Sequence, residues 1–368
     1  MKLIVFLPYV IASVRSALIP DMDSDSGPSP LKIDFKIHRS NESSGENNDR
    51  FAFGKRNGYP VLIIDYADVI YYTDMNFGSN KQPGSVWIDT GSSIMWVPEN
   101  NYDPSTSTTS YDTGNPFTIG YIDGTTYTGE YYLDTVEFGD SGPELSKFYF
   151  AKSSKSGSHG LLGLADLYDS SSRRDSNLIW SLHDQGLISK ASYSLFLGPD
   201  HGSGSVIFGG VDTEKYTGDL VSYDVSTYQL DSRVPVESVS INGKVIPQLG
   251  EFVLDSGTSL GLVSQELLDE LDVAFNSTIK NGNHYVDCDQ PNDKFLEFDF
   301  GKNVIRVPFS NALARIGDTC YLGFTYNNGV QILGDAFLRN AYVYFDFSNK
   351  RVALAQALYS DSSNIISA

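Results

Sequence analysis

Cysteine and histidine are scarce in this 368-residue chain, which has two of the first and five of the second. A chain of this length is no disulfide-stapled miniprotein and must bury hydrophobic cores of its own. The histidines are scattered and show no spacing typical of metal ligands: His38, His159, His183, His201 and His284. We therefore expect no bound metal and no cofactor.

Basic residues are also few. The chain has 26 Lys and Arg against 46 Asp and Glu, a formal net charge of -20. Such a surface repels nucleic-acid phosphates and anionic lipid headgroups, which excludes both as expected partners. The negative charge decreases as carboxylates protonate near pH 4, so the acidic composition fits an acidic working environment. The alternative is that the charge serves only to keep the protein soluble.

Long hydrophobic runs are absent except at the start of the chain. Met1 and Lys2 precede an apolar run over residues 3–12, followed by small residues at Ser13, Ser16 and Ala17. This pattern is typical of a secretory signal peptide and is too short to span a bilayer. Residues 360–368 lack the hydrophobic tail of a GPI signal. We expect residues 1–17 to be a signal peptide and the protein to be secreted and extracellular.

A dibasic pair, Lys55-Arg56, follows a polar region and precedes the apolar run 61–64. Residues 31–37 within that region alternate apolar and polar side chains, as a half-buried strand does. We interpret residues 18–56 as a propeptide that a dibasic-specific protease removes after Arg56, so that the mature chain begins at Asn57. An ordinary solvated loop pair is the alternative. We further hypothesise that the basic segment 32–39 occupies an acidic cleft until cleavage.

Short apolar runs separated by Gly, Asn, Asp and Pro dominate the remaining chain, which favours an all-β fold. Typical runs are 69–72, 85–89, 131–138, 147–151, 205–208 and 341–347. Helical patterns are few and are expected over residues 177–187, 264–275 and 310–316.

One internal repeat stands out. An apolar stretch leads to Asp89-Thr90-Gly91-Ser92, and another leads 166 residues later to Asp255-Ser256-Gly257-Thr258. That spacing is the size of a domain, so the repeat predicts two similar lobes, residues 57–200 and 201–368, that each donate one carboxylate to a shared cleft.

Paired carboxyl groups carry a specific chemistry. Two of them about 3 Å apart share one proton, so the ionised member can activate water while the neutral member protonates a carbonyl; aspartic proteases are the standard example. We therefore take Asp89 and Asp255 as catalytic candidates. The hydroxyls of Thr90, Ser92, Ser256 and Thr258 can fix the carboxylates and tie the two turns together.

The chain resembles the pepsin-family aspartic proteases, and most of all the candidapepsin-type secreted proteases of yeasts. The resemblance covers nearly everything after Asn57. The matching stretches are 89–98, 117–125, 160–164, 207–212, 332–339 and 353–356. It implies an all-β, bilobal pepsin-like fold, with an active-site cleft between two similar lobes.

The same resemblance assigns roles to further residues. It implies that Tyr121 closes a flap over substrate, that Trp96 steadies it, and that Gly91, Gly257 and Thr258 contact the bound peptide. Without it, Tyr121 would be an ordinary sheet aromatic and Trp96 a core residue. Asp123-Gly124 alone indicates a hairpin turn, and a flap is itself a hairpin.

The chain departs from that family at three places. Ile122 follows the flap tyrosine where Gly is usual, which affects the flap tip. Trp87 should face the same side as Asp89 because strand side chains alternate, and it is bulkier than the usual aliphatic residue, so we expect a smaller or reshaped substrate pocket. Residues 99–116 lack a two-cysteine loop, so one rim of the cleft should be more open.

Two features of the second lobe remain. Cys288 and Cys320 are an even pair in a chain expected to be secreted, which predicts a disulfide, and closing this 32-residue loop contributes about 3.7 kcal/mol on the chain-entropy model. Asn276-Ser277-Thr278 is an acceptor for N-glycosylation.

Two rival functions deserve a test. Residues 257–261 match the G-x-S-x-G elbow of serine hydrolases, which requires a strand, a turn and a helix in a parallel α/β sheet. A catalytically dead relative that only binds peptides would keep the same cleft. The function we expect is a monomeric aspartic endopeptidase that cleaves proteins and peptides at acidic pH, with apolar side chains favoured at the scissile bond.

Overall fold

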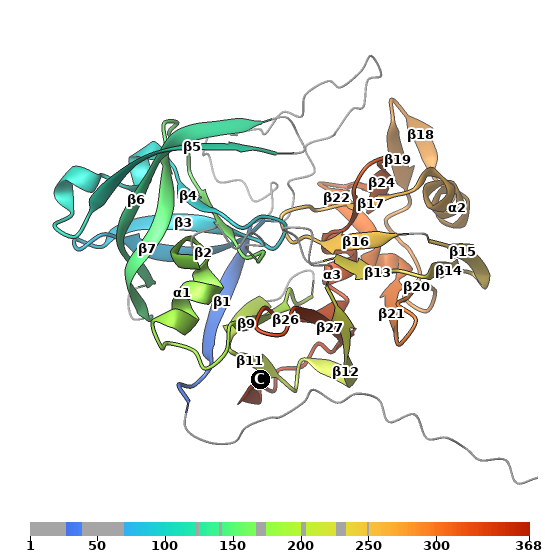
Figure 1. The fold of residues 1–368 in the computed structure, drawn as a ribbon. Coiled ribbons are helices and arrows are strands. Elements are labelled where there is room, and N and C mark those ends of the chain that lie inside the picture. The colour runs from blue at the N-terminus through green and yellow to red at the C-terminus, as the bar shows by residue number, and fades with distance from the viewer. Residues whose placement is uncertain are drawn as a thin grey trace, which may run out of the picture.

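The computed structural model describes residues 27–38, 70–121, 125–139, 142–166, 174–199, 204–225, 233–248 and 250–368. Strands dominate these ranges, so the expected all-β class is confirmed (Figure 1). None of the helices within them is long and apolar enough to cross a membrane. The expected signal peptide, the Lys55-Arg56 pair, Asn57, Ile122 and Asp123 lie outside the described residues.

Among the described strands, one sheet runs through the first half and the centre of the molecule. Its order is β12 (Tyr216–Asp224), β27 (Arg351–Ala357), β26 (Ala341–Asp346), β9 (Ser192–Phe196), β10 (Gly204–Phe208), β1 (Leu31–His38), β2 (Ile70–Phe77), β3 (Gln82–Asp89), β8 (Gly160–Gly163), β4 (Met95–Val97), β7 (Glu144–Ser153), β6 (Thr126–Phe138) and β5 (Tyr111–Gly120). Strands from both ends of the chain therefore meet in its middle.

The second half forms smaller sheets, three of which lie on the side of Figure 1 opposite β5, β6 and β7. One contains β13 (Arg233–Pro235), β16 (Glu251–Leu254), β25 (Gln331–Leu333), β17 (Gly261–Val263) and β24 (Phe324–Tyr326). A second contains β15 (Lys244–Pro247), β14 (Ser238–Ile241), β20 (Phe295–Asp299) and β21 (Val304–Pro308). A third contains β18 (Thr278–Lys280), β19 (Asn283–Val286), β23 (Thr319–Leu322) and β22 (Leu313–Ile316), and β11 (Gly210–Asp212) pairs with β28 (Ile365–Ser367).

The described helices are short. They are α1 (Leu178–Asp184), α2 (Gln265–Phe275), α3 (Asp335–Leu338) and the 3₁₀ turns η1 (Glu99–Asn101), η2 (Pro104–Thr106), η3 (Arg174–Ser176) and η4 (Phe309–Asn311). The Asn177 side chain caps α1, and the Ser264 side chain caps α2. The helix predicted over 310–316 is wrong, because η4 ends at Asn311 and β22 then pairs with β23 in a hairpin.

The two sequence repeats occupy matching places in the two halves. β3 lies parallel to β8, which is antiparallel to β4, and β16 lies parallel to β25, which is antiparallel to β17. Each Asp backbone is held to its parallel neighbour: Leu164 N donates to Asp89 O at 2.7 Å, and Asp255 N donates to Leu333 O at 3.2 Å. Each half thus carries its Asp on a loop supported by the same pair of strands.

The segment upstream of the dibasic pair forms a strand of the central sheet. β1 pairs antiparallel with β10 on one side and with β2 on the other. Phe35 is buried against Tyr71, and Lys36 forms an ion pair with Asp74 at 2.5 Å. The hypothesis that residues 32–39 fill the cleft is therefore wrong for residues 32–38, which the structure describes. The backbone of this segment pairs with β10 and β2 in the central sheet, and its apolar side chain Phe35 is buried there.

The buried side chain of Asp134 anchors residues 99–116, the region that lacks the two-cysteine loop. Asp134 is 1% exposed and accepts hydrogen bonds from the Tyr102 hydroxyl at 2.7 Å and from Thr109 Oγ1 at 2.5 Å. Burial raises the pKa of Tyr102 well above its usual range, so this phenol remains a donor. Side-chain hydrogen bonds therefore anchor this loop to β6.

The predicted disulfide is present in the second half. Cys288 and Cys320 are bonded, with their Cα atoms 5.2 Å apart. The bond ties β23 to the segment that follows β19.

Candidate active site

The structure brings Asp89 and Asp255 together at the junction of the two halves. Asp89 is the last residue of β3 and Asp255 directly follows β16; they are 6% and 8% exposed. A Cβ atom added to Gly257 would lie 2.7 Å from Asp89 Oδ1 and 3.2 Å from Asp255 Oδ1. Both carboxyls therefore face one small space, and only glycine fits beside them.

Each carboxyl accepts one hydrogen bond from the backbone N–H two residues later and one from the hydroxyl three residues later. The donors are Gly91 N at 2.8 Å and Ser92 Oγ at 2.5 Å for Asp89, and Gly257 N at 2.8 Å and Thr258 Oγ1 at 2.6 Å for Asp255. The contacts repeat with the sequence motif, so the two carboxyls are oriented in the same way.

Thr90 and Ser256 join the two loops. Thr90 Oγ1 donates to Leu254 O at 2.8 Å and accepts from Ser256 N at 2.9 Å. Ser256 Oγ donates to Ile88 O at 2.8 Å and accepts from Thr90 N at 3.1 Å. Every donor and acceptor in this crossed network is paired, which fixes one loop relative to the other.

Burial raises the pKa of Asp89, and the neighbouring charge of Asp255 raises it further. The hydrogen bonds from Ser92 and Gly91 oppose this rise but are the smaller effects. A proton is therefore held at this carboxyl at pH values where a solvated aspartate has lost it.

Tyr121 directly follows β5 in the hairpin of β5 and β6, and Trp96 lies on β4, which β7 separates from that hairpin in the sheet. Trp96 Nε1 donates to the Tyr121 hydroxyl at 2.7 Å. Trp96 belongs to a small buried cluster with Phe117, Ala151 and Leu161, against which Tyr121 packs. The hairpin tip with Asp123 is outside the described residues.

Trp87 lies across from Tyr72 on β2 and beside Leu161 on β8. Its ring centroid is 5.9 Å from that of His159, whose ring also contacts Tyr72 edge-on at 5.4 Å. An aromatic group thus stands two residues before Asp89. Its effect on a substrate pocket stays a prediction.

The serine-hydrolase pattern over residues 257–261 lacks the context that such an enzyme requires. β17 begins at Gly261, and α2 begins only at Gln265, so no helix follows the candidate serine Ser259 directly. Within the described ranges, no group of three or more His, Cys, Asp or Glu is arranged to hold a metal ion.

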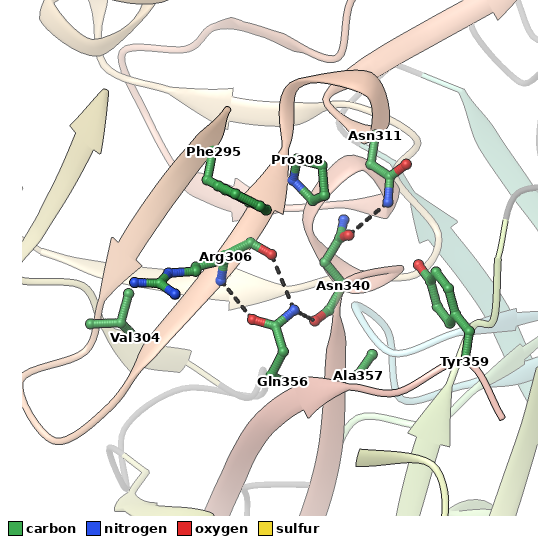
Figure 2. A pocket seen from close by; sticks show the side chains of 9 residues that line it. All are labelled: Phe295, Val304, Arg306, Pro308, Asn311, Asn340, Gln356, Ala357 and Tyr359. Carbon is green, nitrogen blue, oxygen red and sulfur yellow. Dashed lines mark hydrogen bonds between the residues drawn. The ribbon is translucent and has the colours of Figure 1, made fainter. Parts of the chain in front are cut away.

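Figure 2 shows a cavity of about 610 Å³ in the second half, which contains none of the predicted site residues. Its lining residues are Phe295, Val304, Arg306, Pro308, Asn311, Asn340, Gln356, Ala357 and Tyr359. The Gln356 side chain spans it, accepting from Arg306 N at 2.8 Å and donating to Arg306 O at 3.1 Å and Asn340 O at 2.9 Å. These polar groups serve the packing of β21 against β27.

Residues 70–357 match the family model of the eukaryotic aspartyl proteases. The chain belongs to this family. The aspartyl protease is 34% identical over 401 aligned positions to candidapepsin-3 of Candida albicans (strain WO-1), covering 98% of this chain and 99% of that protein. It is 32% identical over 394 positions to candidapepsin-1 of the same strain, covering 98% and 99%, and 35% identical over 322 positions to secreted aspartic protease 8 of Candida albicans (strain SC5314 / ATCC MYA-2876), covering 80% and 78%.

Family membership confirms the resemblance and the bilobal pepsin-like fold, and it makes this aspartyl protease an aspartic-type endopeptidase that acts on proteins or peptides. Sequence reasoning missed the carbonyl groups of Ile88 and Leu254, since any residue supplies them. It also missed Tyr127, which stacks on Trp96. The only feature of the sequence that points to Tyr127 is its place six residues after Tyr121.

Proposed function

We propose that the protease is secreted as a zymogen and hydrolyses peptide bonds at acidic pH with Asp89 and Asp255 as its catalytic pair. The observation that carries the proposal is the pair of buried carboxyls facing one space with matched hydrogen bonds. Asp89, whose pKa is raised, holds the proton that the pair shares.

In this mechanism the ionised carboxylate takes a proton from water as the oxygen attacks the peptide carbonyl carbon. The neutral carboxyl gives its proton to the carbonyl oxygen, forming a tetrahedral diol. The C–N bond then breaks: one diol hydroxyl loses its proton to the pair, the leaving nitrogen gains one, and an acid and an amine are released. The substrate lies extended between the flap hairpin and the carboxyls. The apolar cluster of Trp96, Phe117 and Leu161 favours apolar side chains at the scissile bond.

A peptide library sampled from about pH 3 to about pH 7 tests this function. We expect cleavage in acid between apolar residues, blocked by pepstatin and unaffected by a serine-directed fluorophosphonate. Inhibition by the fluorophosphonate alone would favour the serine-hydrolase rival, and peptide binding without cleavage would favour the dead relative.

Maturation is expected to occur at Lys55-Arg56, by a dibasic-specific protease of the secretory pathway. N-terminal sequencing of the active, secreted protein should give Asn57 or a residue close to it, and changing Arg56 to Ala should leave the longer chain. An active enzyme that begins near Ala17 or Leu18 would refute the zymogen.

Two further expectations concern the secreted protein. Gel filtration should give a monomer. Intact masses measured before and after endoglycosidase treatment should show a glycan at Asn276, which is exposed at the end of α2.

A second dibasic pair, Arg173-Arg174, serves as an internal control for cleavage at Lys55-Arg56. Arg174 lies with its guanidinium carbon 3.8 Å from the Trp180 ring centroid and is paired with Asp184 at 2.9 Å. It belongs to η3, whereas processing proteases bind extended chains. We expect no cleavage after Arg174.

A further inference from the structure

Tyr127 lies in the flap hairpin, close to its tip. It pairs across the hairpin with Ile119, and two residues nearer the tip Tyr121 N donates to Thr125 O at 3.0 Å. Its ring is half-buried against the cluster that contains Trp96. A side chain at this position can act on the flap without touching the carboxyl pair.

Three aromatic rings contact one another there. The Tyr127 ring stacks on the Trp96 indole, with centroids 4.3 Å apart and planes inclined by 30°. Tyr127 also meets Tyr121 edge-on at 6.2 Å and 79°, while Trp96 Nε1 donates to the Tyr121 hydroxyl at 2.7 Å. Rotation of the indole would break the stack and the hydrogen bond together, so Tyr127 restrains the donor on which Tyr121 depends.

Lys155 holds this group from outside the hairpin. Its Nζ lies 5.3 Å from the Tyr127 ring centroid and donates to Thr126 O at 3.1 Å. The Lys155 backbone is itself fixed, since its N–H donates to Ser153 Oγ and its carbonyl accepts from Glu99 N, each at 3.0 Å. The part of the flap hairpin next to its tip is thereby attached to the body of the first lobe.

We propose that Tyr127 is a positioning residue of this protease: by stacking on Trp96 it keeps the indole N–H on the Tyr121 hydroxyl and so holds the flap in the arrangement that closes over substrate. This inference rests on the proposed function, because it assigns the flap to a substrate bound at Asp89 and Asp255.

Steady-state kinetics of the processed enzyme with an eight-residue fluorogenic peptide tests the proposal. Changing Tyr127 to Ser should lower kcat/KM about tenfold, mainly through a higher KM and weaker pepstatin binding, because the closed flap is less populated. Tyr127→Phe keeps the ring and should restore kcat/KM to within about twofold of the parent. Unchanged kinetics in Tyr127→Ser, or an equal loss in Tyr127→Phe, would overturn it.

Tyr285→Ser is the matched control. Tyr285 lies on β19 in the second half, where its ring packs on that of Tyr321 with centroids 4.9 Å apart and lies 6.0 Å from Lys280 Nζ, so its loss removes comparable contacts away from Tyr121. It should lower Tm without changing KM. An equal rise in KM would show a general packing effect and overturn the proposal.

Coupling to Trp96 provides the second readout. In a Trp96→Phe background, which lacks the indole donor, Tyr127→Ser should have little further effect on KM. Full additivity would refute the route through Trp96. An inactive parent enzyme would instead refute the proposed function, so the two failures are distinguishable.

Discussion

Changing Asp89 to Asn is expected to abolish peptide hydrolysis while the protein stays folded. Asparagine has nearly the same shape but cannot share or move the proton, so kcat should fall by about 1,000-fold or more. Asp255→Asn should have the same effect, because each carboxyl accepts an equivalent pair of hydrogen bonds. Turnover of a fluorogenic peptide by purified variants with the same N-terminus measures the loss.

The same substitution should stabilise the protein near neutral pH. Burial raises the pKa of Asp89 in the folded state above its unfolded value of 3.8. The folded state therefore binds more protons than the unfolded state, so the free energy of unfolding falls as pH rises from the unfolded pKa through the folded pKa. Asparagine does not titrate. Calorimetry should give Asp89→Asn a higher Tm than the parent at about pH 7, with the gap closing near pH 4.

Asp212→Asn is the control, for which we expect the opposite result: a lower Tm and an unchanged kcat. This carboxylate is fully buried and accepts from Ser363 Oγ at 2.6 Å and Asn364 N at 2.8 Å, which holds the C-terminal segment. Its loss should lower Tm and leave kcat unchanged. Substantial turnover in either Asp89→Asn or Asp255→Asn would rule out the dyad, and a lower Tm of Asp89→Asn at neutral pH would contradict the desolvation account.

The carboxyl pair was accessible from the sequence because each half of the site is locally complete. The partners of Asp89 lie only two and three residues along the chain, and those of Asp255 follow the same spacing. A short motif therefore carries the whole local geometry, and its repetition at domain spacing indicates that two such loops meet.

The remaining features depend on contacts that no local pattern encodes. Thr90 donates to the carbonyl of Leu254, 164 residues away, and that acceptor is backbone. The strand over 31–37 is visible in its alternation, but its place between β10 and β2 depends on the sheet that receives it. Residues 313–316 form β22 because β23 pairs with them, which outweighs their helical pattern.

With rising pH, activity is expected to fall before the protein unfolds and to return on re-acidification. The proposed mechanism requires one proton on the pair, so the rate should follow a bell-shaped profile bounded by the two macroscopic pKa values of the dyad. Because burial and the charge of Asp255 raise the pKa of Asp89, the alkaline limb should lie above the ordinary aspartate value of about 3.9. Beyond it, two adjoining anions remain and no proton is available for the carbonyl.

Unfolding should come later for two reasons. The links between the loops join hydroxyls, backbone N–H groups and carbonyls, through Thr90 and Ser256, and none of these titrates in this range. Surface carboxylates are already ionised by about pH 5, so their repulsion changes little above it. Ionisation of Asp89 lowers the free energy of unfolding but leaves these links and the cores intact.

Parallel measurements of kcat/KM and near-UV circular dichroism from about pH 3 to about pH 8 separate the two events. Activity should decline while the dichroism signal is unchanged, and samples returned to acid should recover full activity. Asp89→Asn should keep its near-UV signal to a higher pH than the parent, since it lacks the buried group that ionises. Simultaneous and irreversible loss of both signals in the parent would mean that unfolding, rather than ionisation of the carboxyl pair, sets the alkaline limb.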